Sequence, residues 1–318
     1  MSIDIRSVEG ESELAAAVQL MSETHPELAR RVGLGQAGCA DTDLWHTRVA
    51  MDGTKLVAAG QILDKMMWLN GQQVPFAGLS CLSVHPDYRG KFKLSELVRD
   101  TVDILKEFGY ALSVVFTDDN GLYEPHGFVP MPAIEFAFER FAAYDTSGVR
   151  PFDAGKDLER VMKLHTAFNQ GRHGPVVRSR LDWERQVELM QPDRETFWVL
   201  ERDGHLNAYL RGRLVDGTLV ISEFGGDKSY AAYFRRILTV VFDELDFYTA
   251  RISLRREEPF FNAAYIPARQ RQDTRMMWAV LNPDRIAQFL GFPGPQEVMK
   301  FIQQLRDFQT TFWLEDTF

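Results

Sequence analysis

The sequence predicts an α/β fold built from two tandem domains and a short C-terminal arm. The chain has 318 residues, which exceeds the length of an average single domain. Helical and strand-like segments alternate along its first half, and the same order of segments begins again after residue 150. These observations place the two domains at residues 1–145 and 146–285, and the arm at residues 286–318.

The first domain is expected to begin with helices and to continue into a strand meander. Apolar spacing over Leu14–Val32 is helical, with a break at Thr24-His25-Pro26. Leu94–Phe108 is an amphipathic helix that Gly109 closes. The predicted strands are Leu44–Met51, Leu56–Leu63, Val74–Val84, Tyr110–Thr117 and Ile134–Phe138. This order favours a mixed, mostly antiparallel sheet flanked by helices.

The second half repeats this order with a different sequence, which favours a duplicated domain. Helices are expected at Asp157–Asn169, from Ser179 and at Tyr230–Leu245. The predicted strands are Thr196–Glu201, His205–Leu214, Thr218–Phe224, Phe247–Leu254 and Arg275–Leu281. The arm is expected to contain a helix at Gln296–Phe308.

Composition excludes several classes of function. The formal net charge of −9 argues against nucleic-acid binding and favours the approach of cationic ligands such as amines. The two cysteines, Cys39 and Cys81, and the histidines show no metal-ligand spacing, so we expect no metal. The N-terminus does not resemble a signal peptide, and no apolar run could span a bilayer. We therefore expect a cytoplasmic protein without membrane contact.

The first motif with chemical meaning is a strand that leads through a basic turn into a helix. Residues 79–91 are LSCLSVHPDYRGK, and the helix begins at Leu94. Backbone N–H groups at a helix N-terminus suit a pyrophosphate, and Arg89, Lys91 and Lys93 add positive charge. Taken alone, the turn is more typical of an ordinary strand–turn–helix corner with solvated basic residues.

A second motif, DDNGLYEPHGF over residues 118–128, follows the next buried strand. Neighbouring strands whose ends splay apart expose backbone groups that can hold an extended ligand. A tyrosine at that opening, Tyr123, is suited to protonating a departing thiolate. A core aromatic residue whose hydroxyl reaches the surface fits the same pattern.

Together the two motifs resemble those of GNAT acetyltransferases. Residues 84–91 resemble the acetyl-CoA turn of that superfamily, and Tyr123-x-x-x-Gly127-Phe128 resembles its downstream tyrosine motif. The tandem second half is similar to the enhanced intracellular survival (Eis) family. Those proteins join a catalytic GNAT domain, a second GNAT-like domain and a C-terminal domain, and they acetylate amines, including aminoglycosides and lysines. The resemblance covers roughly residues 1–285 and implies two tandem GNAT-like domains that use acetyl-CoA as co-substrate.

The resemblance implies a binding site for acetyl-CoA along two strand ends and the turn that follows the first of them. The corresponding residues are Leu82, Ser83, Val84, Arg89, Gly90, Lys91, Phe92, Lys93, Leu94, Ser95, Asp118 and Asp119. It also implies that Tyr123 is the general acid and that the terminal carboxylate, here of Phe318, is the general base. Phe312 and Trp313 would dock the tail.

Three features depart from the family pattern. Phe92 stands where the turn has a glycine, and its Cβ is expected to obstruct the pyrophosphate unless Gly90 shifts the turn. Leu94 stands where the superfamily has a small residue. The tail is also too short for a C-terminal domain, which weakens the assignment of Phe318 as base.

The second half has no Pro-x-x-Arg-Gly segment. Instead, EFGGDK over residues 223–228 precedes the helix, so we expect a non-catalytic domain that forms a wall of the substrate cleft. His85 and His126 lie beside the two motifs, but a turn residue and a rim residue are the simpler interpretations.

The leading hypothesis is an N-acetyltransferase in which a primary amine of a small molecule or lysine attacks the thioester directly. The alternative is a non-catalytic acyl-CoA-binding or regulatory protein, which Phe92 favours. A third hypothesis is a tandem-GNAT enzyme of a biosynthetic pathway. Glu23, Glu27 and Asp41 would suit a cationic acceptor, while the acceptor itself and the oligomeric state, including a homo-oligomer, stay open.

Overall fold

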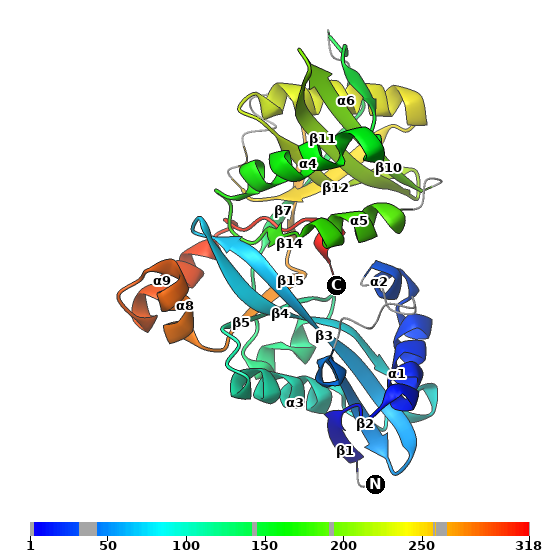
Figure 1. Ribbon diagram of the computed structural model, residues 1–318, viewed down its shortest axis with the longest axis vertical. Helices are drawn as coiled ribbons and strands as arrows, with labels where there is room; N and C mark the ends of the chain where they lie inside the picture. Colours follow the sequence, from blue (N-terminus) through cyan, green and yellow to red (C-terminus); the bar gives the residue numbers. More distant parts are fainter. Residues whose placement is uncertain are drawn as a thin grey trace.

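The computed structural model describes residues 3–31, 43–141, 145–190, 194–256, 258 and 266–317. Within these ranges the chain forms two sheets with flanking helices, which we call the first and second lobes (Figure 1). The first lobe contains the N-terminus and lies in the lower part of Figure 1, and the second lobe lies above it. The predicted mixed α/β fold is confirmed.

The first sheet has the strand order β1-β2-β3-β4-β5-β15-β6, and β9 pairs with β3. Its strands are β1 (Ile3–Ser7), β2 (Thr47–Asp52), β3 (Lys55–Leu69), β4 (Gln72–Val84), β5 (Leu112–Phe116), β6 (Val129–Pro130), β9 (Val176–Val177) and β15 (Met276–Val280). β4 and β5 are parallel, whereas β4 is antiparallel to β3. The predicted site lies beside β4, where an antiparallel neighbour on one side meets a parallel neighbour on the other.

Helices cover both faces of the first sheet. Val49 and Met51 of β2 pack with α1 (Glu11–Thr24), whereas Ala50 between them packs with α3 (Leu94–Glu107). Successive side chains of a strand point to opposite faces, so α1 and α3 lie on opposite sides. The short helix α2 (Pro26–Arg31) continues from α1 after the predicted break at His25.

The second sheet has the strand order β14-β7-β13-β12-β11-β10-β8. Its strands are β7 (Ala133–Glu139), β8 (Val149–Pro151), β10 (Glu195–Arg202), β11 (His205–Val215), β12 (Thr218–Gly226), β13 (Thr249–Leu254) and β14 (Arg269–Asp273). The helices α4 (Ala154–Asn169) and α5 (Arg180–Glu188) share one apolar cluster with β10 and β11, and α6 (Tyr230–Leu245) packs in the larger core. β12 and β13 are parallel, as β4 and β5 are.

Besides the two-residue strand β9, which pairs with β3, each sheet takes one strand from the other half of the chain. β7 was expected to end the first domain but lies between β13 and β14, and β15 was expected to end the second domain but lies between β5 and β6. Each exchanged strand is paired along both edges, so the exchange ties the two lobes together. The domain boundaries stay a prediction, but these two strands depart from a simple division at residue 145.

The arm consists of α8 (Pro283–Leu290), α9 (Pro295–Leu305) and a returning tail that ends in the short turn η6 (Leu314–Asp316). The tail runs back from α9 between the two lobes (Figure 1, red). The Phe312 ring lies 4.6 Å from the Phe116 ring of the first sheet, measured between centroids. Trp313 is 1% exposed and donates a hydrogen bond of 3.0 Å to Asn169 of α4. Both predicted anchors of the tail are therefore buried.

Most predicted elements occur within a few residues of their expected bounds, and the exceptions have local causes. Leu44–His46 forms a 3-10 turn, η2, instead of the start of a strand, and β2 begins at Thr47. The edge strand β1 is partly exposed along its length and was not predicted. α8 was not predicted either, although Pro283 at its start and Gly291 after its end are typical helix boundaries.

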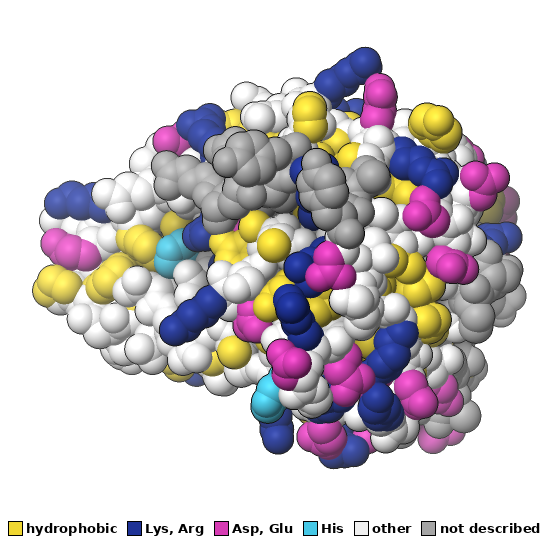
Figure 2. Space-filling view, turned by 90° about the horizontal axis from the view of Figure 1, so that it is seen from above, with side chains coloured by type: hydrophobic (Ala, Val, Ile, Leu, Met, Phe, Trp, Pro, Cys, Tyr) yellow, Lys and Arg dark blue, Asp and Glu magenta, His cyan; other side chains and the backbone are white. Residues whose placement is uncertain are grey.

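Two surface properties bear on partners. Among the described residues, no helix is long and apolar enough to cross a bilayer. Figure 2 shows Lys and Arg side chains interspersed with Asp and Glu on the upper face of the second lobe.

Candidate functional site

The site begins at a bulge in β4. Ala59 of β3 pairs with Ser83, but Gln61 pairs with Ser80, so Cys81 and Leu82 face a single residue of β3. Cys81 has φ +53°, and its carbonyl accepts a 2.8 Å hydrogen bond from the Ser83 hydroxyl. A bulge bends its strand and redirects the backbone groups beside it. The Cys81 side chain is buried, at 3% exposure.

Beyond the bulge, β4 separates from its parallel neighbour. The β4–β5 pairing ends at Leu79 with Val115. The His85 N–H donates to the Val57 carbonyl of β3, so by the alternation of an antiparallel ladder the backbone of Val84 faces away from β3. The ends of β4 and β5 therefore splay apart, as the sequence predicted.

The basic turn follows directly. Pro86–Tyr88 forms a 3-10 turn, Gly90 adopts φ +75°, and α3 begins at Leu94 without a side-chain cap. The first N–H groups of an α-helix have no partner within the helix, so those of Leu94 and Ser95 are suited to an anion. The left-handed backbone at Gly90 favours glycine, and a Cβ there would meet no atom within 4 Å.

Phe92 differs from the expectation. Its side chain is half-buried and packs with the apolar cluster that contains Tyr88 and Leu97. Its N–H donates a 3.0 Å hydrogen bond to the Tyr88 carbonyl, so that amide is occupied within the turn. The predicted obstruction assumed a side chain beside the phosphates, whereas Phe92 anchors the turn to the sheet.

The three predicted cationic residues of the turn, Arg89, Lys91 and Lys93, are all exposed. The Lys91 ammonium donates to the Asp87 carbonyl at 2.9 Å and so closes the turn from outside. Exposed cations beside an uncapped helix N-terminus create a locally positive site on a net-acidic chain.

Tyr123 lies between two short 3-10 turns, η4 (Asn120–Leu122) and η5 (Glu124–His126). Its side chain is 5% exposed and packs in the core cluster of Val115 and Phe128. Burial raises the pKa of the Tyr123 hydroxyl above its usual value, and the negative charge of Asp119 raises it further. No hydrogen bond of this hydroxyl occurs within the described ranges, so a proton on it is free to be donated to a ligand.

Asp118 and Asp119 are exposed at the end of β5, next to the opening. The Asp119 N–H donates to the Thr117 hydroxyl at 2.9 Å, which fixes the start of the loop. The structure thus brings together the end of β4, the basic turn, the end of β5 and the tyrosine loop. Phe318 lies outside the described residues.

Sequence reasoning missed one histidine at this site. The Nε2 atom of His25 lies 2.9 Å from the carbonyl oxygen of Leu82, on the bulge itself. A histidine directly before Pro26 at a helix break was the available signal, but its contact lies 57 positions away in the sequence.

Sequence reasoning also missed a buried ionic cluster in the second lobe. Arg178 donates to both Glu223 of β12 and Asp316 of the tail, at 3.0 and 2.6 Å, and its side chain is 1% exposed. Arg211 lies 3.0 Å from Glu315 of the tail. After β13, the Arg256 N–H donates to the Phe308 carbonyl. The tail therefore bridges the separated ends of β12 and β13.

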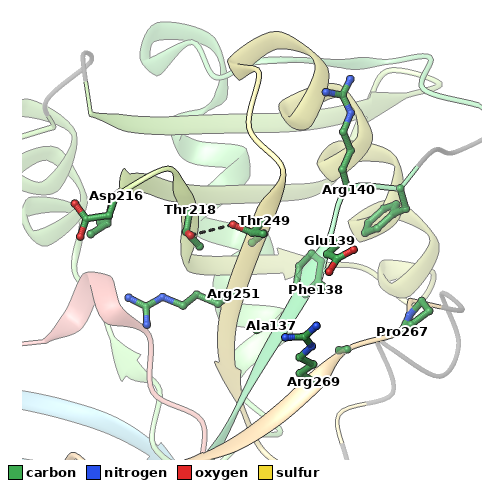
Figure 3. Close-up of a pocket in the computed structure, with 14 residues that line it drawn as sticks. Ala137, Phe138, Glu139, Arg140, Asp216, Thr218, Thr249, Arg251, Pro267 and Arg269 are labelled. Atoms are coloured by element: carbon green, nitrogen blue, oxygen red, sulfur yellow. Dashed lines mark hydrogen bonds between the residues drawn. The ribbon is translucent and has the colours of Figure 1, made fainter.

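A separate cleft of about 880 Å³ opens at the other end of these strands (Figure 3). Thr218 of β12 and Thr249 of β13 share a 2.9 Å hydrogen bond there, and Arg251 and Arg269 project nearby. None of the predicted site residues lines this cleft. Among the residues that the structure describes, no group of His, Cys, Asp and Glu side chains could hold a metal ion.

Comparisons with known proteins agree with this geometry. Residues 6–131 match the family described as the acetyltransferase (GNAT) domain. The N-acetyltransferase Eis of Mycobacterium tuberculosis is 24% identical over 191 residues, which cover 51% of this chain and 47% of that protein. The chain thus spans about half the length of the curated relatives it matches.

Solved structures share the fold. Eis1 from Mycobacterium abscessus aligns with a TM-score of 0.64 and 15% identity, over 89% of this chain and 74% of that one. A probable N-acyltransferase from Enterococcus faecalis aligns with a TM-score of 0.73 and 14% identity, over 91% of this chain and 75% of that one.

Proposed function

We propose, from the premise that this chain is an Eis-like member of the GNAT acetyltransferases, that it transfers the acetyl group of acetyl-CoA to a primary amine. The acceptor belongs to a small molecule or a lysine side chain. The observation that carries the proposal is a buried tyrosine with a raised pKa beside the splayed ends of β4 and β5.

Backbone groups at the end of β4 and in the basic turn bind acetyl-CoA. The pantetheine arm pairs with the end of β4 from Leu82 to Val84, and the pyrophosphate rests on the N–H groups from Gly90 to Ser95 other than those of Lys91 and Phe92, which donate to the Tyr88 carbonyl. The exposed side chains of Arg89 and Lys93 complete the anion site.

In the transfer step the amine nitrogen attacks the thioester carbonyl, whose developing negative charge is stabilised by N–H groups at the bulge. The C–S bond breaks, and its electron pair goes to sulfur, which takes the hydroxyl proton of Tyr123. A raised pKa keeps Tyr123 protonated at neutral pH, as a general acid requires.

The non-catalytic alternative loses its main support. Phe92 packs against the sheet and leaves the N-terminus of α3 open, so this residue does not argue against binding of acetyl-CoA.

Release of free thiol from acetyl-CoA with a panel of primary amines tests the proposal. We expect Tyr123→Phe to lower kcat by about 10²- to 10⁴-fold while calorimetry shows unchanged acetyl-CoA affinity. The ring stays in place in this variant, so the fold is kept. Full turnover in Tyr123→Phe would remove it from the mechanism, and tight cofactor binding without turnover on any amine would favour the non-catalytic alternative.

A further inference from the structure

His25 lies at the junction between α1 and α2, which we call the elbow, and backbone hydrogen bonds fix it on both sides. Its N–H donates to the Met21 carbonyl at 2.8 Å at the end of α1, and its own carbonyl accepts from the Ala29 N–H of α2 at 2.8 Å. The side chain is half-buried, and its Nε2 atom lies 2.9 Å from the Leu82 carbonyl oxygen. The imidazole is therefore held against the β4 bulge and is not a freely moving surface group.

The contact with Leu82 determines which ring nitrogen is basic. A carbonyl oxygen only accepts hydrogen bonds, so Nε2 must carry the hydrogen. In the neutral ring, Nδ1 then has the free lone pair. Nδ1 has no hydrogen-bond partner in the part of the chain that the structure describes, which leaves that lone pair available to a bound molecule.

The elbow is also braced from the second lobe. Arg30 of α2 donates to the Leu189 carbonyl and to Glu195 of β10, and Glu27 lies 3.1 Å from Arg213 of β11. Among the side chains that the structure describes there, the charged groups of the elbow are Glu23, Glu27 and Arg30, with Glu195 and Arg213 opposite. This bracing keeps the imidazole in place on the side of the bulge that α1 and α2 cover.

We propose that His25 is the general base of the transfer, an assignment that rests on the proposed function. Nδ1 takes the proton from the acceptor amine as its nitrogen forms the bond to the thioester carbon. The electron pair of the breaking C–S bond goes to sulfur, and Tyr123 supplies the proton for the thiolate. The imidazolium and the tyrosinate then return to their starting states by exchange with solvent.

The competing base is the terminal carboxylate of Phe318. Comparing His25→Gln with a chain that lacks Phe318 distinguishes the two candidate bases. A glutamine side chain can keep an N–H on the Leu82 carbonyl but has no basic nitrogen, so it preserves the contact and removes only the base. His205→Gln, at an exposed histidine of β11, is the matched control.

We expect His25→Gln to lower kcat by about 10²- to 10⁴-fold, with acetyl-CoA affinity and the KM for acetyl-CoA unchanged and the acidic limb of the pH–rate profile lost. The chain without Phe318 is expected to keep that limb. Near-normal turnover in His25→Gln, with loss of turnover after removal of Phe318, would overturn the assignment and leave the proposed function standing. A wild-type protein that acetylates no amine would overturn both.

Discussion

Each lobe contains a bulged strand that separates from its parallel neighbour, but different groups lie beside the gap that results. In both, a parallel pairing ends and a bulge follows: β4 leaves β5 after Leu79, and β12 leaves β13 after Val220. Three residues later stand Leu82 in the first lobe and Glu223 in the second. The Leu82 carbonyl contacts His25 at the splayed end of β4, whereas Glu223 is fully buried against Arg178 and the tail.

The same strand arrangement therefore surrounds a different group in each lobe. In the first lobe, we propose that the gap between the strands binds acetyl-CoA. In the second, the chain's own tail closes the gap through Arg178, Arg211 and two apolar side chains, Phe308 and Trp313. The second lobe thereby holds the tail and braces α2, and its non-catalytic role stays a prediction.

The number of cofactor sites tests this comparison most directly. Since the tail closes the gap beside β12, we expect isothermal titration calorimetry to show one acetyl-CoA site per chain. Replacing Lys93 with Glu places negative charge at the N-terminus of α3 and should weaken that site, because the helix dipole and the lost cation both favour an anion there. A second site that survives Lys93→Glu would show that the second lobe also binds the cofactor.

Removing Arg178 should have the largest effect on stability. Arg178→Met removes the nearest cation from the buried carboxylates of Glu223 and Asp316, while Arg211 stays 3.7 Å from Glu223, and we expect the free energy of unfolding to fall by about 3 to 5 kcal/mol. The control Arg180→Met removes an arginine whose side chain is 61% exposed and whose ion pairs are worth about 0 to 1 kcal/mol. Chemical denaturation of both variants measures the difference. Equal, small losses would mean that the cluster does not hold the tail.

Phe92 tests how the first lobe's turn is anchored. Phe92→Ala should lower the free energy of unfolding by about 1.5 to 2.5 kcal/mol, half the cost for a fully buried phenylalanine, because the side chain is half-buried. Acetyl-CoA affinity should not improve in Phe92→Ala or Phe92→Gly. Tighter binding in the glycine variant alone would restore the obstruction that the sequence suggested.

Local sequence signals predicted the structural elements around the first lobe's candidate site, since these elements are short and contiguous. The turn at Gly90, the start of α3 and the Tyr123 loop each depend on a few neighbouring residues. The exchange of β7 and β15 could not be predicted in this way, because both strands read as ordinary buried strands and their partners are set by tertiary pairing. The contacts of His25 with Leu82 and of Arg178 with Asp316 likewise join residues 57 and 138 positions apart.

Both lobes contain an ion pair between a strand and the helix that follows it. Arg6 of β1 pairs with Glu13 of α1, and Arg150 of β8 pairs with Asp157 of α4, with the same spacing of seven residues. The hydrogen bond from Arg6 lowers the pKa of Glu13 to about 2, from a usual value of 4.5. Since the folded-state pKa is the lower one, this pair contributes stability above about pH 4.5, and the contribution is lost as the pH falls through about 2.

The repeated pair gives the smallest expected effect. The Glu13 side chain is 29% exposed, so solvent weakens the interaction, and Glu13→Gln should cost about 1 kcal/mol or less at pH 7. The difference from wild type should shrink as the pH is lowered from 4.5 toward 2, because the wild-type carboxylate becomes protonated there. Glu11→Gln, an exposed change in the same helical turn, serves as control in denaturation at several pH values. A loss in Glu13→Gln that stays constant down to pH 2 would show that the pair acts through packing and not through charge.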